Sequence, residues 1–133
     1  MSEGFKLEIV NPEKSFLLKE AVSEVVIPAF EGDMGILKDH ISIISFLKPG
    51  LLRVFENSSK EEIYYVEDGI MEFKDNCLSI LTSNIFDIKK VDKNTLKDAL
   101  TKAEKDNQSK DISDQKKYML GQKIEVLKSL TLN

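Results

Sequence analysis

The apolar pattern of this 133-residue chain changes its period once, at Asp92. Before this point the apolar residues fall in short runs separated by turn residues, as at Asn11-Pro12 and Pro49-Gly50. Beyond it they recur three and four residues apart, which is the spacing of a helix. Short strands at spacings of about 8 to 12 residues are typical of antiparallel β-sandwiches and barrels. The sequence therefore predicts an α+β fold in which strands precede helices.

The first 88 residues are predicted to form an antiparallel β-sandwich of about eight to ten strands. In the first strand, Phe5, Leu7 and Ile9 alternate with charged residues, which places the apolar side chains on one face. The predicted strands are 5–9, 16–18, 22–27, 41–47, 51–55, 63–66, 70–73, 77–81 and 85–88. The segment from Gly32 to His40 is predicted to be a loop, because its two glycines permit positive φ angles.

The first predicted helix begins after Asp92 or Asn94, either of which is a suitable N-cap. Its apolar face repeats at i, i+3, i+4 and i+7. The residues on this face are Leu96, Ala99, Leu100 and Ala103. Residues 105–111 are polar and are predicted to form a loop.

A second helix is predicted after Asp111 or Ser113. Its main stripe is Leu120, Ile124, Leu127 and Thr131, with Met119, Val126 and Leu130 beside it. Both stripes are narrow, so the two helices are expected to pack as an antiparallel hairpin over residues 89–133. A hairpin of about 40 residues buries little apolar area and is expected to be marginally stable. Such a tail is able to detach and change shape.

The two parts of the chain carry opposite net charge. Residues 1–88 hold seven lysines and one arginine against sixteen acidic residues, a net charge of −8. Residues 89–133 hold eleven lysines against seven acidic residues, a net charge of +4. A basic tail indicates an acidic partner surface, although plain solvated helices also carry charge of this size. Arg53 is the sole arginine, which argues against bidentate recognition of nucleic acid.

His40 is the only histidine and the one candidate for acid–base catalysis. Ser42 or Ser45 would be the nucleophile of such a site. Adjacent residues on a strand point to opposite faces, however, so Asp39 is badly placed to orient the imidazole. A Gly-x-Ser-x-Gly elbow is also missing from the sequence. We therefore expect His40 to be a structural loop residue or a contact to a partner protein, with a small hydrolase as the minor alternative.

No cofactor or metal site is predicted. The Gly32-Asp33-Met34-Gly35 segment lacks the lysine of a phosphate-binding loop. One cysteine and one histidine cannot build a zinc site, and Cys77 is expected to be buried and inert. The apolar runs are too short to span a bilayer, and the acidic N-terminus does not resemble a signal peptide. These features predict a cytoplasmic protein without direct membrane insertion.

Four stretches, in this order, resemble the epsilon subunit of bacterial F-type ATP synthases. They are Phe-Lys-Leu-Glu-Ile-Val-Asn-Pro-Glu at 5–13, Gly-Asp-Met-Gly-Ile-Leu-Lys-Asp-His at 32–40, Leu-Lys-Pro-Gly-Leu-Leu-Arg-Val at 47–54 and Asp-Gly-Ile-Met-Glu at 68–72. The resemblance covers essentially the whole chain and implies a ten-stranded β-sandwich followed by two helices. It also implies a non-catalytic central-stalk, or rotor, subunit of a proton- or sodium-translocating synthase. Such a subunit lies peripherally on the cytoplasmic face of the inner membrane and couples the gamma subunit to the c-ring.

The resemblance implies partners for individual residues of the sandwich. Asp33 and Met34 match the segment that faces the c-ring, and His40 matches a residue at the gamma contact. Met34, flanked by glycines, is expected to be exposed, since methionine adapts to uneven partner surfaces. The Pro-Gly that usually precedes the histidine is replaced here by Lys38-Asp39.

The resemblance also implies a regulatory tail. In many bacterial members the two helices alternate between a compact hairpin and an extended form that reaches the catalytic alpha/beta head and inhibits ATP hydrolysis. Four lysines of the second helix are expected to be drawn to an acidic segment of the beta subunits, an attraction that salt weakens. They are Lys116, Lys117, Lys123 and Lys128. The alternative is a free-standing interaction module whose basic helices bind an acidic partner surface.

Some relatives bind ATP on the hairpin through an Ile/Leu-Asp-x-x-Arg-Ala motif. Here Val91-Asp92 is followed by Lys-Asn-Thr-Leu, and the motif's arginine is missing. Lysine lacks the forked donor set of arginine. ATP binding by the isolated subunit is therefore predicted to be weak or absent.

Overall fold

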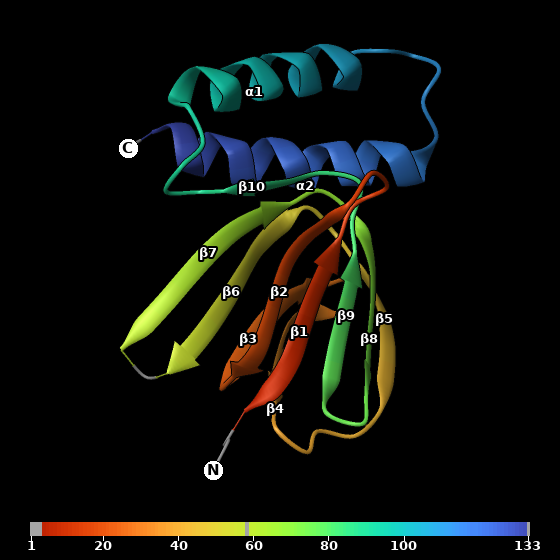
Figure 1. Ribbon diagram of the computed structural model, residues 1–133. Coiled ribbons are helices and arrows are strands. Elements are labelled where there is room, and N and C mark those ends of the chain that lie inside the picture. Colours follow the sequence, from red (N-terminus) through yellow and green to blue (C-terminus); the bar gives the residue numbers. More distant parts are fainter. Residues whose placement is uncertain (1–3, 58, 133) are drawn as a thin grey trace.

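The computed structural model describes residues 4–57 and 59–132, and a pair of helices covers one end of its strands (Figure 1). The strands are β1 Phe5–Val10, β2 Ser15–Val22, β3 Glu24–Ala29, β4 Gly32–Leu37, β5 Ile43–Leu47, β6 Gly50–Asn57, β7 Lys60–Val66, β8 Gly69–Lys74, β9 Cys77–Leu81 and β10 Ile85–Asp87. The helices are α1 Lys93–Asn107 and α2 Asp114–Thr131. This arrangement confirms the α+β fold expected from the sequence.

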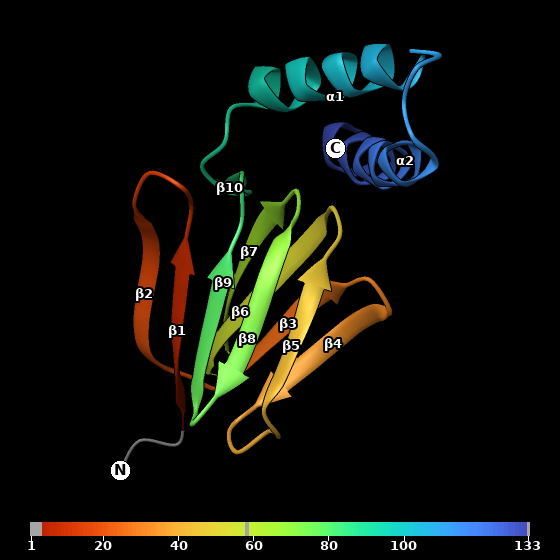
Figure 2. The ribbon, with the colours of Figure 1, turned by 90° about the vertical axis from the view of Figure 1, so that its right-hand side faces the viewer.

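The strands form two layers of five. One layer runs β10-β7-β6-β3-β4 and the other runs β5-β8-β9-β1-β2 (Figure 2). The layers are joined where Ala29 of β3 lies opposite Leu47 of β5. The expectation of a wholly antiparallel sandwich is wrong at one place, because β1 and β9 pair in parallel, from Lys6 opposite Cys77 to Val10 opposite Leu81.

The predicted loop at 32–40 is wrong over its first six residues, which form β4. This strand pairs with β3 from Gly32 opposite Ala29 to Leu37 opposite Glu24. Gly32 has a φ of 131°, so it supplies the turn conformation that the sequence indicated and the strand begins there. Inward and outward side chains alternate along β4, with Met34 and Ile36 facing the core, but the glycines made this pattern hard to recognise in the sequence. Met34 is half-buried and packs against the core, so its expected exposure is also wrong.

The main core lies between the two layers. It is built by the inward-facing residues, which alternate with outward-facing ones along the strands. Phe5, Leu7 and Ile9 are at most 2% exposed, as their alternation predicted. The rings of Phe5 and Phe73 meet edge to face, with centroids 5.4 Å apart. Side chains of both layers therefore exclude water from a single contiguous apolar interior.

A charged cluster holds β2 beside β6 and β7. The Lys19 ammonium pairs with the carboxylates of Glu56 and Glu62, the second at 2.8 Å. The Tyr64 hydroxyl donates a hydrogen bond to Glu62 as well, at 2.5 Å. Hydrogen bonds from Lys19 and then from Tyr64 lower the pKa of Glu62. The cluster links strands that belong to different layers.

Each helix begins at a side-chain cap. Asp92 caps α1 by accepting a hydrogen bond from the backbone N–H of Asn94 at 3.1 Å. Ser113 caps α2 in the same way through Lys116 at 3.1 Å. Helix α1 continues to Asn107 and so extends into the segment expected to be a loop. Neither helix of the described ranges is long and apolar enough to cross a membrane.

The helices form a compact hairpin that is docked on the sandwich. Tyr65, Leu96 and Leu127 are the buried centre of a second apolar cluster between the hairpin and the outer face of β6, β7 and β10. The partly buried residues around them are Leu51, Phe86, Ile88, Val91, Ala99, Leu100, Val126 and Leu130. This cluster shares no buried residue with the main core between the layers.

Candidate protein-docking surface

An apolar row crosses the outer face of the second layer. Phe46 of β5 lies opposite Ile70 of β8, which in turn lies opposite Leu81 of β9. These side chains are 61%, 37% and 49% exposed. Val10 of β1 pairs with Leu81 and extends the row, and Ile44 is exposed beside it. A contiguous exposed apolar surface of this kind typically marks a protein–protein contact.

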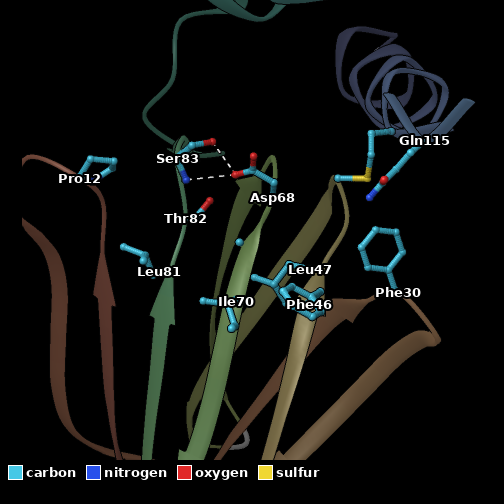
Figure 3. Close-up of a pocket in the computed structure, with 12 residues that line it drawn as sticks. Pro12, Phe30, Phe46, Leu47, Asp68, Ile70, Leu81, Thr82, Ser83 and Gln115 are labelled. Atoms are coloured by element: carbon cyan, nitrogen blue, oxygen red, sulfur yellow. Dashed lines mark hydrogen bonds between the residues drawn. The ribbon is translucent and has the colours of Figure 1, made fainter. Parts of the chain in front are cut away.

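The apolar row opens into a groove of about 580 Å³ beneath α2. Figure 3 shows Phe46, Ile70 and Leu81 on the strands, with Gln115 of α2 above them. The rim is polar, since the Asp68 carboxylate accepts hydrogen bonds from the Ser83 N–H at 3.2 Å and from its hydroxyl at 2.5 Å (Figure 3). An apolar floor with a hydrogen-bonding rim is the usual composition of a protein interface.

Asp33 lies at the helix end of β4, not beside His40. Its exposed carboxylate borders a second groove together with Lys48 and Arg53 of the sandwich and Glu125 of α2. Close to this end of the strand, the rings of Phe30 and Tyr118 stack with centroids 6.3 Å apart. The structure therefore places Asp33 near the hairpin, while Met34 beside it packs inward.

His40 lies beyond the other end of β4, next to the turn between β8 and β9. Its Nδ1 is 2.7 Å from the Ile41 carbonyl, and its ring meets Phe73 edge to face at 5.9 Å. The Asp39 carboxylate instead accepts a hydrogen bond from the Asn76 amide at 2.9 Å. Asp39 has a φ of 67°, a left-handed conformation that directs it toward this turn. The Asp39 carboxylate therefore does not orient the His40 imidazole, as the hypothesis of a catalytic histidine would require.

Of the two serines considered as nucleophiles, Ser45 is buried between the layers. Its hydroxyl donates a hydrogen bond to Glu31 at 3.2 Å. Among residues 4–57 and 59–132, no group of three or more potential metal ligands gathers. Cys77 is half-buried, so its expected full burial is wrong.

The four lysines singled out on α2 do not form one free basic patch. Lys116 and Lys117 are exposed. Lys123 forms an ion pair with Glu67 of the sandwich at 2.5 Å, with both side chains about one-fifth exposed. Lys128 lies 4.0 Å from Glu104 of α1. The compact hairpin therefore uses two of the four lysines within the chain.

Sequence reasoning missed the apolar row. Its members come from strands far apart in sequence, and only the register of β5, β8 and β9 brings them into line. One signal was present, because the outward positions of residues 43–47 are apolar and the inward ones also include Ile43 and Leu47, whereas a surface strand of an antiparallel sheet usually has one polar face. Ile44 and Phe46 are the residues that break that rule.

Residues 4–88 match the family model described as the β-sandwich domain of the ATP synthase delta/epsilon chain. The match covers more than half of the chain, and it defines the class to which the sandwich belongs. The chain is 65% identical to the ATP synthase epsilon chain of Pelagibacter ubique (strain HTCC1062), over 98% of this chain and 99% of that relative. It is 35% identical to the epsilon chain of Dichelobacter nodosus (strain VCS1703A), over 79% and 73%. The chain belongs to the ATP synthase epsilon chain family.

Two solved structures share the fold. A chain in the cryo-EM structure of Euglena gracilis mitochondrial ATP synthase, OSCP/F1/c-ring, superposes with a TM-score of 0.75 at 23% identity, over 99% of this chain and 82% of that chain. A chain in the Tetrahymena thermophila mitochondrial ATP synthase central stalk/c-ring structure gives a TM-score of 0.64 at 16% identity, over 98% of both chains. At these identities the likeness shows the architecture, including the helical pair after the sandwich.

Proposed function

We propose that this chain is a non-catalytic rotor subunit that couples the gamma subunit to the c-ring. The observation that carries the proposal is the apolar row of Phe46, Ile70 and Leu81. These large apolar side chains are exposed in the free chain, and a contiguous surface of this kind typically marks a protein–protein contact. Membership of the epsilon chain family and the central-stalk and c-ring assemblies that contain chains of the same fold support it. In a bacterium the subunit would lie peripherally on the cytoplasmic face of the inner membrane.

The sandwich, residues 1–88, would hold both contacts. The apolar row and His40 would face gamma, which would supply a complementary apolar surface. Asp33, at the far end of β4, would face the polar loops of the c-ring, with Met34 supporting the strand from the core side. Asp33 lies near one end of β4 and His40 beyond the other, which supports two distinct contacts.

Co-purification with gamma tests this assignment. A tagged gamma subunit co-expressed with the chain is expected to retain it in equimolar amount through a wash at high salt, because an apolar contact is insensitive to ionic strength. A free-standing module that binds acidic surfaces through its basic helices would instead elute as the salt concentration rises. Failure of gamma to retain the chain at any salt concentration would exclude the rotor assignment.

Residues 89–133 would regulate hydrolysis by leaving the sandwich and extending toward the catalytic head. Helix α2 has 18 residues and spans about 27 Å at 1.5 Å per residue, which gives it reach along a stalk. Lys116 and Lys117 are free to meet an acidic beta-subunit surface, whereas Lys123 must first leave Glu67. The ATP-binding motif lacks its arginine, so binding of ATP to the hairpin is expected to be weak or absent.

Deletion of residues 89–133 is expected to raise the ATP hydrolysis rate of the assembled synthase, because the inhibitory element is removed. The rate is measured at saturating ATP on complexes of equal subunit content. The double substitution Lys116→Glu with Lys117→Glu tests the role of charge while keeping the full tail. It should also raise the rate, because an acidic beta-subunit surface would repel the new carboxylates. Both side chains are exposed in the compact form, so the substitutions should not disturb the hairpin. Unchanged hydrolysis in both variants would remove the inhibitory role and leave the rotor assignment standing.

A further inference from the structure

Tyr65 lies on the outer face of β7, at the centre of the cluster between hairpin and sandwich. Its neighbours across the strands are Leu51 of β6 and Phe86 of β10, and its ring stacks on that of Phe86 with centroids 5.7 Å apart. Leu96 of α1 and Leu127 of α2 belong to the same cluster. Tyr65 is fully buried, with an exposed fraction of 0%.

The Tyr65 hydroxyl has no hydrogen-bond partner among the residues that the structure describes. The neighbouring Tyr64 differs, because its hydroxyl donates to Glu62. Burial, followed by the nearby charges of Glu67 and Asp68, raises the pKa of Tyr65, so the group stays neutral. A neutral hydroxyl that gives up its water and gains no partner destabilises the state in which it is buried.

This cost belongs to the docked hairpin and not to the sandwich. Tyr65 is on the face of β7 opposite to the main core, whose members on this strand are Tyr64 and Val66. Both helices contribute to the cover of this face, through Leu96 of α1 and Leu127 of α2, so we expect the hydroxyl to regain water when the helices leave. The ring favours docking through its apolar contacts, whereas the hydroxyl opposes it.

We propose that the Tyr65 hydroxyl shifts the docking equilibrium of the hairpin. It destabilises the docked form and so reduces the free-energy difference between the docked and undocked forms. A two-state element responds to a partner only when its states lie within a few kcal/mol of each other. Phenylalanine would fill the same space without the penalty, so the hydroxyl is the part of the side chain that sets the balance. The proposal rests on the regulatory tail described above, but it concerns the free subunit.

Hydrogen exchange of the full-length Tyr65→Phe variant, followed by mass spectrometry, tests the proposal. Amides of α1 and α2 are expected to exchange about tenfold more slowly than in the unmodified chain, because removing an unpaired buried hydroxyl stabilises the docked form. Peptides from β1, β8 and β9 should exchange at unchanged rates, since their protection comes from the main core. This difference separates tighter docking from a general rise in stability.

Tyr118→Phe is the matched control. Tyr118 is 46% exposed and stacks on Phe30, so its loss of a hydroxyl removes no buried polar atom and helix exchange should not change. Unchanged or faster helix exchange in Tyr65→Phe would overturn the proposal, the faster rate meaning that the hydroxyl contributes a favourable bond. Because the assay uses the free chain, its result is independent of whether tail deletion alters hydrolysis by the complex.

Discussion

Replacing Phe46 with glutamate is expected to weaken binding to the gamma subunit by about 100-fold or more, because a carboxylate would be buried in an apolar contact without a partner. Phe46 is the β5 member of the apolar row and is 61% exposed in the free chain. The substitution should therefore leave the fold of the isolated subunit intact. Isothermal titration of gamma with the variant gives the affinity, and thermal unfolding checks the fold.

Leu37→Glu is the matched control for that substitution. Leu37 is 55% exposed, about as much as Phe46, but it lies on β4 in the other layer. Its change should leave gamma affinity within about twofold, as expected for a residue outside the buried centre of an interface. Equal losses of affinity in the two variants, or none in Phe46→Glu, would show that gamma binds elsewhere.

Gly69→Ala is expected to lower the free energy of unfolding by about 3 kcal/mol, because the substitution forces strain on the backbone. Gly69 has a φ of 144°, which L side chains rarely adopt. A Cβ atom there would also lie 2.1 Å from the carbonyl oxygen of Leu81. Relief of that clash requires β8 and β9 to separate where Ile70 and Leu81 pair, so the same substitution should perturb the apolar row.

Gly121→Ala provides the contrasting case within the same chain. Gly121 lies inside α2, and a Cβ atom added there meets no atom within 4 Å other than those of its own stretch of helix. Alanine is better than glycine in a helix interior by roughly 0.5–1 kcal/mol, so this variant should be more stable. Urea unfolding of both variants measures the difference in midpoint. A Gly69→Ala variant as stable as the unmodified chain would contradict the backbone argument.

The sequence was informative wherever a single element determines its own pattern. The alternation of Phe5, Leu7 and Ile9 predicted which face is buried, and the helical spacing after Asp92 predicted both helices. The capping alternatives were correctly identified, and Asp92 and Ser113 are the residues used. These features depend on neighbours within a few residues, so they can be predicted from residue propensity and spacing.

The sequence was less informative wherever distant segments meet. The parallel pairing of β1 with β9 and the alignment of Phe46 with Ile70 both depend on strand order, which local patterns do not encode. The strand at 32–37 was hidden because glycine lowers strand propensity, and its pairing with β3 overrides that preference. The expected exposure of Met34 failed for the same reason, since the strand turns this side chain inward.

The parallel pairing of β1 with β9 has a consequence for synthesis of the chain. β1 ends at Val10, yet the strand beside it in the second layer, β9, does not end until Leu81. The first strand to leave the ribosome must therefore wait for about 70 further residues before its sheet is complete, and contacts so distant in sequence are slow to form. During that interval β1 has β2 as its hydrogen-bonded neighbour, and its other edge awaits β9. Since the helices follow β9 and β10 in the chain, the sandwich can close before the hairpin is synthesised, and the hairpin then docks onto a surface that is already formed.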